Sequence, residues 1–176
     1  MDQAGKIETL RQLQSGRDAL REALAGVDDA MAVHKPSRDS WSILDCVEHT
    51  VVTERYLLTR LQAAEPSEQP FEKSRREDKI ARLAADRNRR IEAPEQAQPK
   101  GRFPTLPEAL AAFDATRAEV VKWVEKTTED PRCMLTDHPL IAGPVTCAET
   151  LIMIAAHPAR HARQIIEIRR TLDPGN

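Results

Sequence analysis

The chain has 176 residues, 31% of them charged, and a formal net charge of −2. This balance gives no general attraction to nucleic acid, and no apolar run reaches the about 18 residues of a membrane span. The N-terminus lacks the apolar core of a signal peptide, and the odd count of three cysteines without C-x-x-C spacing favours reduced thiols. We therefore expect one cytoplasmic domain over residues 1–176, with neither a nucleic-acid nor a membrane partner.

Helical periodicity starts at the N-terminus. Apolar residues recur at helical intervals from Gln3 to Ala25, which predicts a first amphipathic helix, and residues 27–41 form a connection. A second helix begins after Ser42, an N-cap candidate that Asp45 completes as a capping box. On this helix His49 lies away from the main apolar stripe, beside a smaller apolar patch that suits the border of a groove.

The middle of the chain predicts a crossover followed by a third long helix. Residues 63–105 are polar and proline-rich at both ends, with a short helical pattern between them. The third helix begins at Thr105, an N-cap, and Arg117 occupies its inward seam between Phe113 and Val120. Three interpretations of Arg117 stay open: it extends its stem to solvent, pairs with a structural carboxylate, or binds an anionic substrate.

The last helix, which begins at Thr146, carries two histidines on its inward seam. His157 and His161 are four residues apart, so one helical face presents both imidazoles. They are either core histidines that bond to a carbonyl, carboxylate or water, or half of a metal site. Pro158 removes a helical amide between them, which predicts a kink or a π-bulge.

Four long amphipathic segments without an alternating strand pattern predict an all-α fold. The expected architecture is a four-helix bundle with a long crossover that carries a short extra helix, and no sheet. A ferritin-like diiron site is disfavoured because no histidine has the E-x-x-H spacing. Cys46, three residues before His49, fits a small buried residue better than a nucleophile.

Several stretches, which together run over essentially the whole chain, resemble the DinB/YfiT-like superfamily. They are W-S-x-x-x-x-x-E-H over residues 41–49, the Gly101-Arg102-Phe103 lead into the third helix with Phe113 and Arg117, the His138-Pro139 and Gly143 loop, and H-x-x-R-H-x-x-Q-I over residues 157–165. The resemblance implies a four-helix bundle in which one histidine of the second helix and two of the last hold a divalent metal. In this chain they correspond to His49, His157 and His161.

The same resemblance implies a reaction class. Three neutral imidazoles suit Zn, Ni or Fe and leave coordination positions open, and a bound metal lowers the pKa of water or of a thiol. Similar proteins are metal-dependent hydrolases or transferases that pass a low-molecular-weight thiol to an electrophile. We expect such a hydrolase or thiol transferase, with a small-molecule electrophile and a thiol cosubstrate. The alternative is a non-catalytic bundle that binds metal or dimerises in a stress response, and homodimers are common among similar proteins.

Four further residues are candidates for supporting this site. Asp45 lies one turn before His49 and is a candidate acceptor for its ring. Arg117 is a candidate anchor for an anionic substrate, and Gln164 is a candidate for contacting the histidines or the substrate. His138 is a candidate extra ligand, although ordering of its loop is the preferred interpretation.

Overall fold

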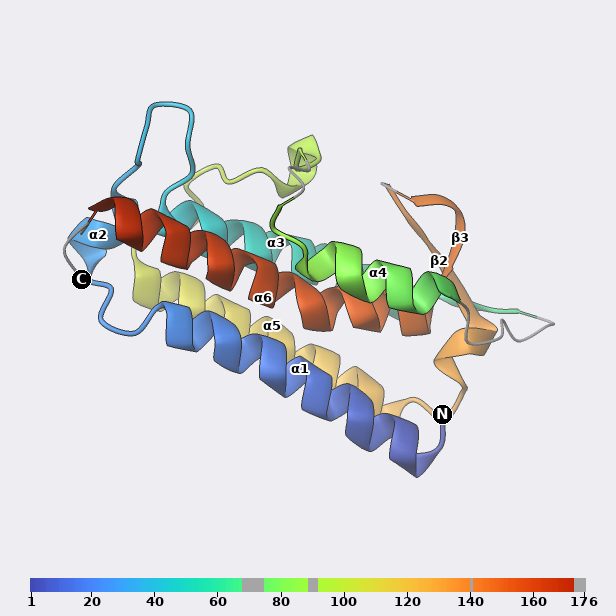
Figure 1. Cartoon of the computed structure of the whole chain (residues 1–176). Coiled ribbons are helices and arrows are strands. Elements are labelled where there is room, and N and C mark those ends of the chain that lie inside the picture. Colours follow the sequence, from blue (N-terminus) through green and yellow to red (C-terminus); the bar gives the residue numbers. More distant parts are fainter. Residues whose placement is uncertain (68–74, 89–91, 140, 173–176) are drawn as a thin grey trace.

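The structure of the chain, a computed structural model, describes residues 1–67, 75–88, 92–139 and 141–172. Its four long helices are α1 (Gln3–Ala23), α3 (Ile43–Gln62), α5 (Leu106–Lys126) and α6 (Cys147–Leu172). They lie side by side as a four-helix bundle (Figure 1), which confirms the predicted fold class. None of the helices in the described part of the chain combines the length and the apolar character that a membrane crossing needs.

The directions of the helices explain the long crossover. Helices α1 and α6 run in one direction, and α3 and α5 run in the other (Figure 1). Because α3 and α5 are parallel, the chain must return along the bundle between them, a distance of about 30 Å for a helix of 20 residues. The returning segment carries α4 (Arg75–Ala85), which packs along α6, and the short 3-10 helix η1 (Glu95–Ala97). This is the predicted crossover with its extra helix.

The predicted capping residues fix where the long helices begin. The Asp45 amide donates to the Ser42 hydroxyl at 3.0 Å, and the Ser42 amide donates to the Asp45 carboxylate at 2.9 Å. Thr146 and Glu149 form the same reciprocal pair at the start of α6, at 3.1 and 2.9 Å, and Thr105 caps α5. These contacts satisfy backbone amides at the first turns of α3 and α6, which have no partner inside the helix.

The prediction that no sheet forms was wrong. Strands β1 (Glu65–Pro66), β2 (Met134–His138) and β3 (Ile141–Thr146) form a small antiparallel sheet at one end of the bundle (Figure 1). Helices α5 and α6 are antiparallel, so a hairpin joins them, and pairing of β2 with β3 satisfies the backbone groups of that connection. A short helix, α2 (Asp29–Val33), is a second unpredicted element, within the connection between α1 and α3.

The core has two apolar clusters with polar groups between them. Phe113 belongs to the cluster nearer the start of α5, and Val120 belongs to the other. Between them on α5 lies Arg117, which is 3% exposed and faces the equally buried Glu54 of α3. An ion pair therefore occupies the middle of the bundle.

Helix α1 approaches α6 closely at Gly16. A Cβ atom at this position would lie 2.1 Å from the carbonyl oxygen of Ala155 and 3.8 Å from Cδ of Pro158. Only glycine fits such a contact between helix backbones. Beside this contact α6 stays α-helical from Cys147 to Leu172, so of the two alternatives expected at Pro158, a kink or a π-bulge, the π-bulge does not form.

Candidate metal centre

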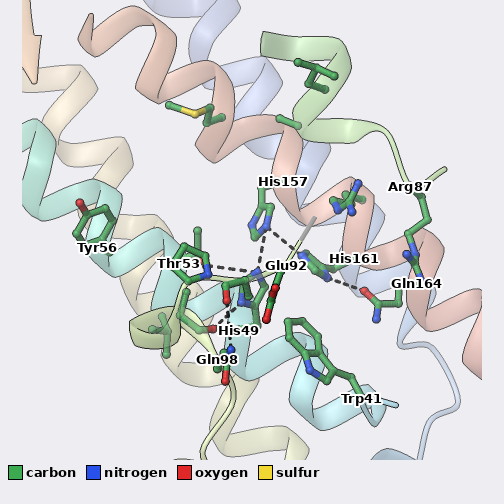
Figure 2. Close-up of a pocket in the computed structure, with 18 of the residues that line it drawn as sticks. Trp41, His49, Thr53, Tyr56, Arg87, Glu92, Gln98, His157, His161 and Gln164 are labelled. Carbon is green, nitrogen blue, oxygen red and sulfur yellow. Dashed lines mark hydrogen bonds between the residues drawn. The ribbon is translucent and has the colours of Figure 1, made fainter. Parts of the chain in front are cut away.

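The structure brings together the three histidines that the sequence singled out. His49 comes from α3, and His157 and His161 come from α6 (Figure 2). Nε2 of His157 lies 3.3 Å from Nε2 of His49 and 3.0 Å from Nε2 of His161. In the described part of the chain, these three residues form a cluster in which each offers one ring nitrogen, and the three nitrogens lie within 4.8 Å of one another.

The cluster is buried on one side by an aromatic ring. His49 is 6% exposed and His161 is 3% exposed, whereas His157 is half-buried. The ring centroid of Trp41 lies 4.9 Å from that of His49 and 6.2 Å from that of His161. Trp41, which directly precedes the cap of α3, thus covers two of the three imidazoles (Figure 2).

Hydrogen bonds on the outer nitrogens fix the orientation of two rings. Nδ1 of His49 lies 2.6 Å from the carbonyl oxygen of Ala97, and Nδ1 of His161 lies 3.1 Å from the side-chain oxygen of Gln164. Both oxygens accept hydrogen bonds, so each Nδ1 carries the proton. The bare Nε2 of each ring then faces His157, which is the tautomer that metal-binding histidines use when Nδ1 donates to a neighbour.

The acceptor for His49 differs from the predicted one. Asp45 caps α3 and forms an ion pair with Lys35 at 3.0 Å, so its carboxylate does not hold the His49 ring. The backbone carbonyl of Ala97 in η1 has that role. No sequence pattern marks this residue, because any residue at this point of the crossover supplies the same carbonyl group.

Glu48 holds the crossover segment that supplies this carbonyl. Its carboxylate is 1% exposed and accepts the amides of Lys100 and Arg102 at 2.6 and 2.9 Å. The Arg102 guanidinium also donates to it at 2.6 Å. The neighbours Glu48 and His49 therefore contact the same segment, and the E-H pair in the motif over residues 41–49 was the signal for this role.

The three nitrogens fit a divalent metal. With protons on Nδ1 of His49 and His161, two Nε2 lone pairs face His157, which has one Nε2 hydrogen at most to share between them. Among the described residues, the Thr53 hydroxyl is a further donor near them, 3.5 Å from Nε2 of His49. A cation between the rings satisfies all three lone pairs. Two nitrogens bound to zinc at about 2.0 to 2.1 Å in a tetrahedral arrangement lie about 3.3 Å apart, close to the observed 3.0 and 3.3 Å.

The surroundings keep the imidazoles neutral. Burial lowers the pKa of His49, and it lowers the pKa values of His157 and His161 well below the usual imidazole range. The closeness of the rings and of Arg160 lowers these pKa values further. Neutral imidazole is the form that binds metal, because the protonated ring has no free lone pair.

The histidines open onto a large cavity between α3, α4, α6 and the crossover. Its volume is about 1470 Å³, and His49, His157 and His161 are part of its wall. Apolar, aromatic and polar side chains line it, among them Val52, Thr53, Tyr56, Ile80, Met153 and Gln164. His138 of β2 also lines this cavity, but it lies outside the three-histidine cluster. Burial lowers the pKa of His138 as well.

Arg117 does not line the cavity and is not placed to anchor a substrate there. Its Nε and Nη2 atoms each donate to the Glu54 carboxylate at 2.7 Å. Nη1 donates to the carbonyl of Leu13 at 2.6 Å, and Nη2 also donates to the carbonyl of Ile154 at 3.2 Å. Of the three interpretations of this arginine, the pairing with a structural carboxylate is the one that the structure shows.

Cys46 lies in the apolar core. It is fully buried, and burial raises the pKa of its thiol, an effect that the nearby Asp45 strengthens. A thiolate is therefore disfavoured at this position, in agreement with the interpretation as a small buried residue.

Comparisons with known proteins identify relatives of this chain. The family model of the DinB superfamily matches residues 12–165, which include all three histidines. The uncharacterized protein YuaE of Bacillus subtilis (strain 168) is 24% identical over 154 residues, covering 85% of this chain and 90% of YuaE.

Solved structures share the fold at low identity. TT2238, a four-helix bundle protein, aligns with a TM-score of 0.57 and 23% identity over 90% of this chain and 96% of its own. YfiT from Bacillus subtilis is described as a probable metal-dependent hydrolase with an unusual four-helix bundle topology. It aligns with a TM-score of 0.60 and 15% identity over 98% of this chain and 90% of its own. The family match covers most of the sequence, and the chain belongs to the DinB superfamily.

Proposed function

We propose that the protein is an enzyme in which His49, His157 and His161 hold a divalent metal that activates a small molecule. The carrying observation is the convergence of three Nε2 atoms at the wall of a large cavity, where Nε2 of His157 lies 3.3 Å from that of His49 and 3.0 Å from that of His161. Three protein ligands leave a coordination position for water or substrate, whereas structural sites are closed by four. Zn, Ni and Fe are the ions that imidazole ligands suit.

The protein's own groups would prepare this centre for chemistry. When bound, such a metal acts as a Lewis acid and lowers the pKa of a water or thiol that it coordinates. The carbonyl of Ala97 and the amide of Gln164 hold two rings in the binding tautomer. Trp41 packs against the rings of His49 and His161 and lines the same cavity.

The cavity favours a reaction with two substrates. Its volume of about 1470 Å³ exceeds the about 300 to 1,000 Å³ of common small-molecule sites. It therefore has room for a low-molecular-weight thiol together with an electrophile. We propose attack of the thiol sulfur on the electrophile as the reaction: the S–H bond breaks, an S–C bond forms, and the proton goes to the group that the electrophile releases or, in an addition without release, to the electrophile itself. Hydrolysis of the electrophile is the second candidate, which the description of YfiT favours.

Metal content of the untagged protein tests this proposal. We expect about one divalent metal per chain in the wild type and its loss in His157→Ala and in His161→Ala. His34→Ala is the matched control, because His34 is exposed on the connection between α1 and α3. Equal metal content in all four proteins would refute the three-histidine centre.

A screen of the metal-loaded protein separates the reactions. Thiol transfer is measured as loss of free thiol in the presence of electrophiles, and hydrolysis is measured without thiol. Turnover in one assay that disappears in His161→Ala supports an enzyme. Stoichiometric metal without turnover in either assay would favour the non-catalytic metal-binding bundle.

A further inference from the structure

Pro158 lies between the two histidines of α6 and leaves a gap in the helix hydrogen bonds. A proline has no amide hydrogen, so the carbonyl of Ile154, four residues earlier, lacks its helical donor. Ile154 is 1% exposed, and water does not reach it readily. A buried carbonyl without a donor is destabilising, so this oxygen needs another partner.

Arg117 supplies the missing donor. Its Nη2 donates to the Ile154 carbonyl at 3.2 Å, while Nε and Nη2 hold the Glu54 carboxylate at 2.7 Å. Nη1 donates to the Leu13 carbonyl at 2.6 Å. One guanidinium on α5 thus bonds to groups on α1, α3 and α6, and links the helices that carry the histidines.

The next carbonyl of α6, that of Ala155, is in close contact with α1. Gly16, one turn after Leu13 on α1, packs directly against the Ala155 carbonyl and beside Pro158. The turn of α6 that precedes His157 is therefore fixed at two successive carbonyls. Glu54, which aligns the guanidinium, is five residues after His49 on α3.

We propose that Arg117, aligned by Glu54, is a positioning residue for the metal centre. By replacing the amide that Pro158 lacks, it fixes the turn from which His157 projects toward His49 and His161. Without this contact the Ile154 carbonyl must tilt toward another donor, and the turn that carries His157 moves with it. The inference rests on the proposed function, because it concerns the spacing of the proposed metal ligands.

A double-mutant cycle tests the inference. Glu54→Gln/Arg117→Met removes both charges and so avoids a lone buried carboxylate. Pro158→Ala restores an amide that donates to Ile154. The readouts are cobalt affinity, measured by competition with a chelator, and the visible spectrum of the bound cobalt. We expect the paired change to weaken cobalt binding about tenfold with Pro158 present, and about twofold or less with Pro158→Ala.

The control is Asp114→Asn, which removes the partner of Arg17 and Arg21 across α1 and α5 without touching α3 or α6. Its cobalt affinity and spectrum should match the wild type. The proposal is overturned if the paired change costs the same affinity in both backgrounds, or if the control loses as much. If the paired variant does not fold, Arg117→Lys takes its place in the same cycle, because lysine keeps the charge and lacks the planar fork.

Failure of the metal centre is distinguishable from failure of this inference. Wild-type protein that binds no cobalt would refute the centre itself. Urea unfolding of the four metal-free proteins of the cycle then tests the carbonyl contact alone. They are the wild type, the paired variant, Pro158→Ala and the combination of the paired change with Pro158→Ala. Coupling between the paired change and Pro158→Ala supports the contact, and additive losses of stability overturn it.

Discussion

Replacing Gly16 by alanine tests the close approach of α1 and α6 beside Pro158. Two effects of opposite sign compete. Alanine is favoured over glycine inside a helix by about 1 kcal/mol, because glycine loses more backbone freedom on folding. Against this, the added Cβ would lie 2.1 Å from the Ala155 carbonyl oxygen, and a backbone oxygen in a helix cannot rotate away.

The steric effect should win. Overpacking of a core costs about 1 to 3 kcal/mol, and a clash with backbone belongs in the upper part of that range. After subtraction of the gain in helix propensity, we expect Gly16→Ala to lower the free energy of unfolding by about 1 to 2 kcal/mol. Equilibrium unfolding in urea should show this as a lower midpoint with an unchanged slope.

Gly5→Ala is the matched control on the same helix. A Cβ at position 5 meets side-chain atoms of Asp2 and Met1, at 3.0 and 3.1 Å, and not backbone. Asp2 caps α1 by accepting the amide of residue 5, so its carboxylate has to shift slightly, and this cost opposes the gain in helix propensity. This variant should therefore stay within about 1 kcal/mol of the wild type. A Gly16→Ala protein as stable as the wild type would contradict the close contact of the two helices.

Four further changes test the Arg117–Glu54 ion pair, the metal centre and the charge of Asp114. Arg117→Met alone leaves the Glu54 carboxylate unpaired, so urea unfolding should show a loss of about 3 to 5 kcal/mol, well above that of the charge-free pair; equal losses would argue against the pairing. Glu48→Gln loosens the segment whose carbonyl orients His49, so chelator competition should show zinc affinity about tenfold lower, and unchanged affinity would remove Glu48 from the site. Although burial raises the pKa of Asp114, two arginines of α1 hold it below its ordinary value of 3.8, so this carboxylate stabilises the fold above that pH and the benefit is lost in acid. The stability difference between wild type and Asp114→Asn should therefore stay constant well above pH 3.8 and shrink as the pH falls through and below this value, and a difference that stays constant in acid would contradict the pairing. Removal of metal by a chelator should lower the melting temperature but leave the helical circular dichroism intact, because the apolar core does not include the metal; loss of the helical signal would contradict this.

Local signals predicted the helices well because the structure uses them directly. Ser42, Thr105 and Thr146 each cap the helix that they were expected to start. The hairpin between α5 and α6 was missed because its strands are short and its pairing follows from the antiparallel helices, which no local pattern encodes. Helix α2, with five residues, is likewise too short to show periodicity.

The sequence predicted only part of the candidate site. Spacing alone placed His157 and His161 on one face, whereas the addition of His49 depended on the resemblance of the whole chain to a family. The partner of Arg117 was left open, because a carboxylate 63 positions away in the sequence gives no local signal. The Ala97 carbonyl was not predicted for a different reason: a backbone group, and not a side chain, accepts the hydrogen bond from His49.

The most direct test of the account is the coordination of the metal itself. X-ray absorption at the zinc edge of the zinc-loaded protein should show three imidazole nitrogens at about 2.0 to 2.1 Å, together with a light atom from water or buffer. The same measurement on His157→Ala should show one imidazole fewer or no bound zinc. A wild-type spectrum with sulfur ligands, or with fewer than three imidazoles, would contradict the three-histidine centre.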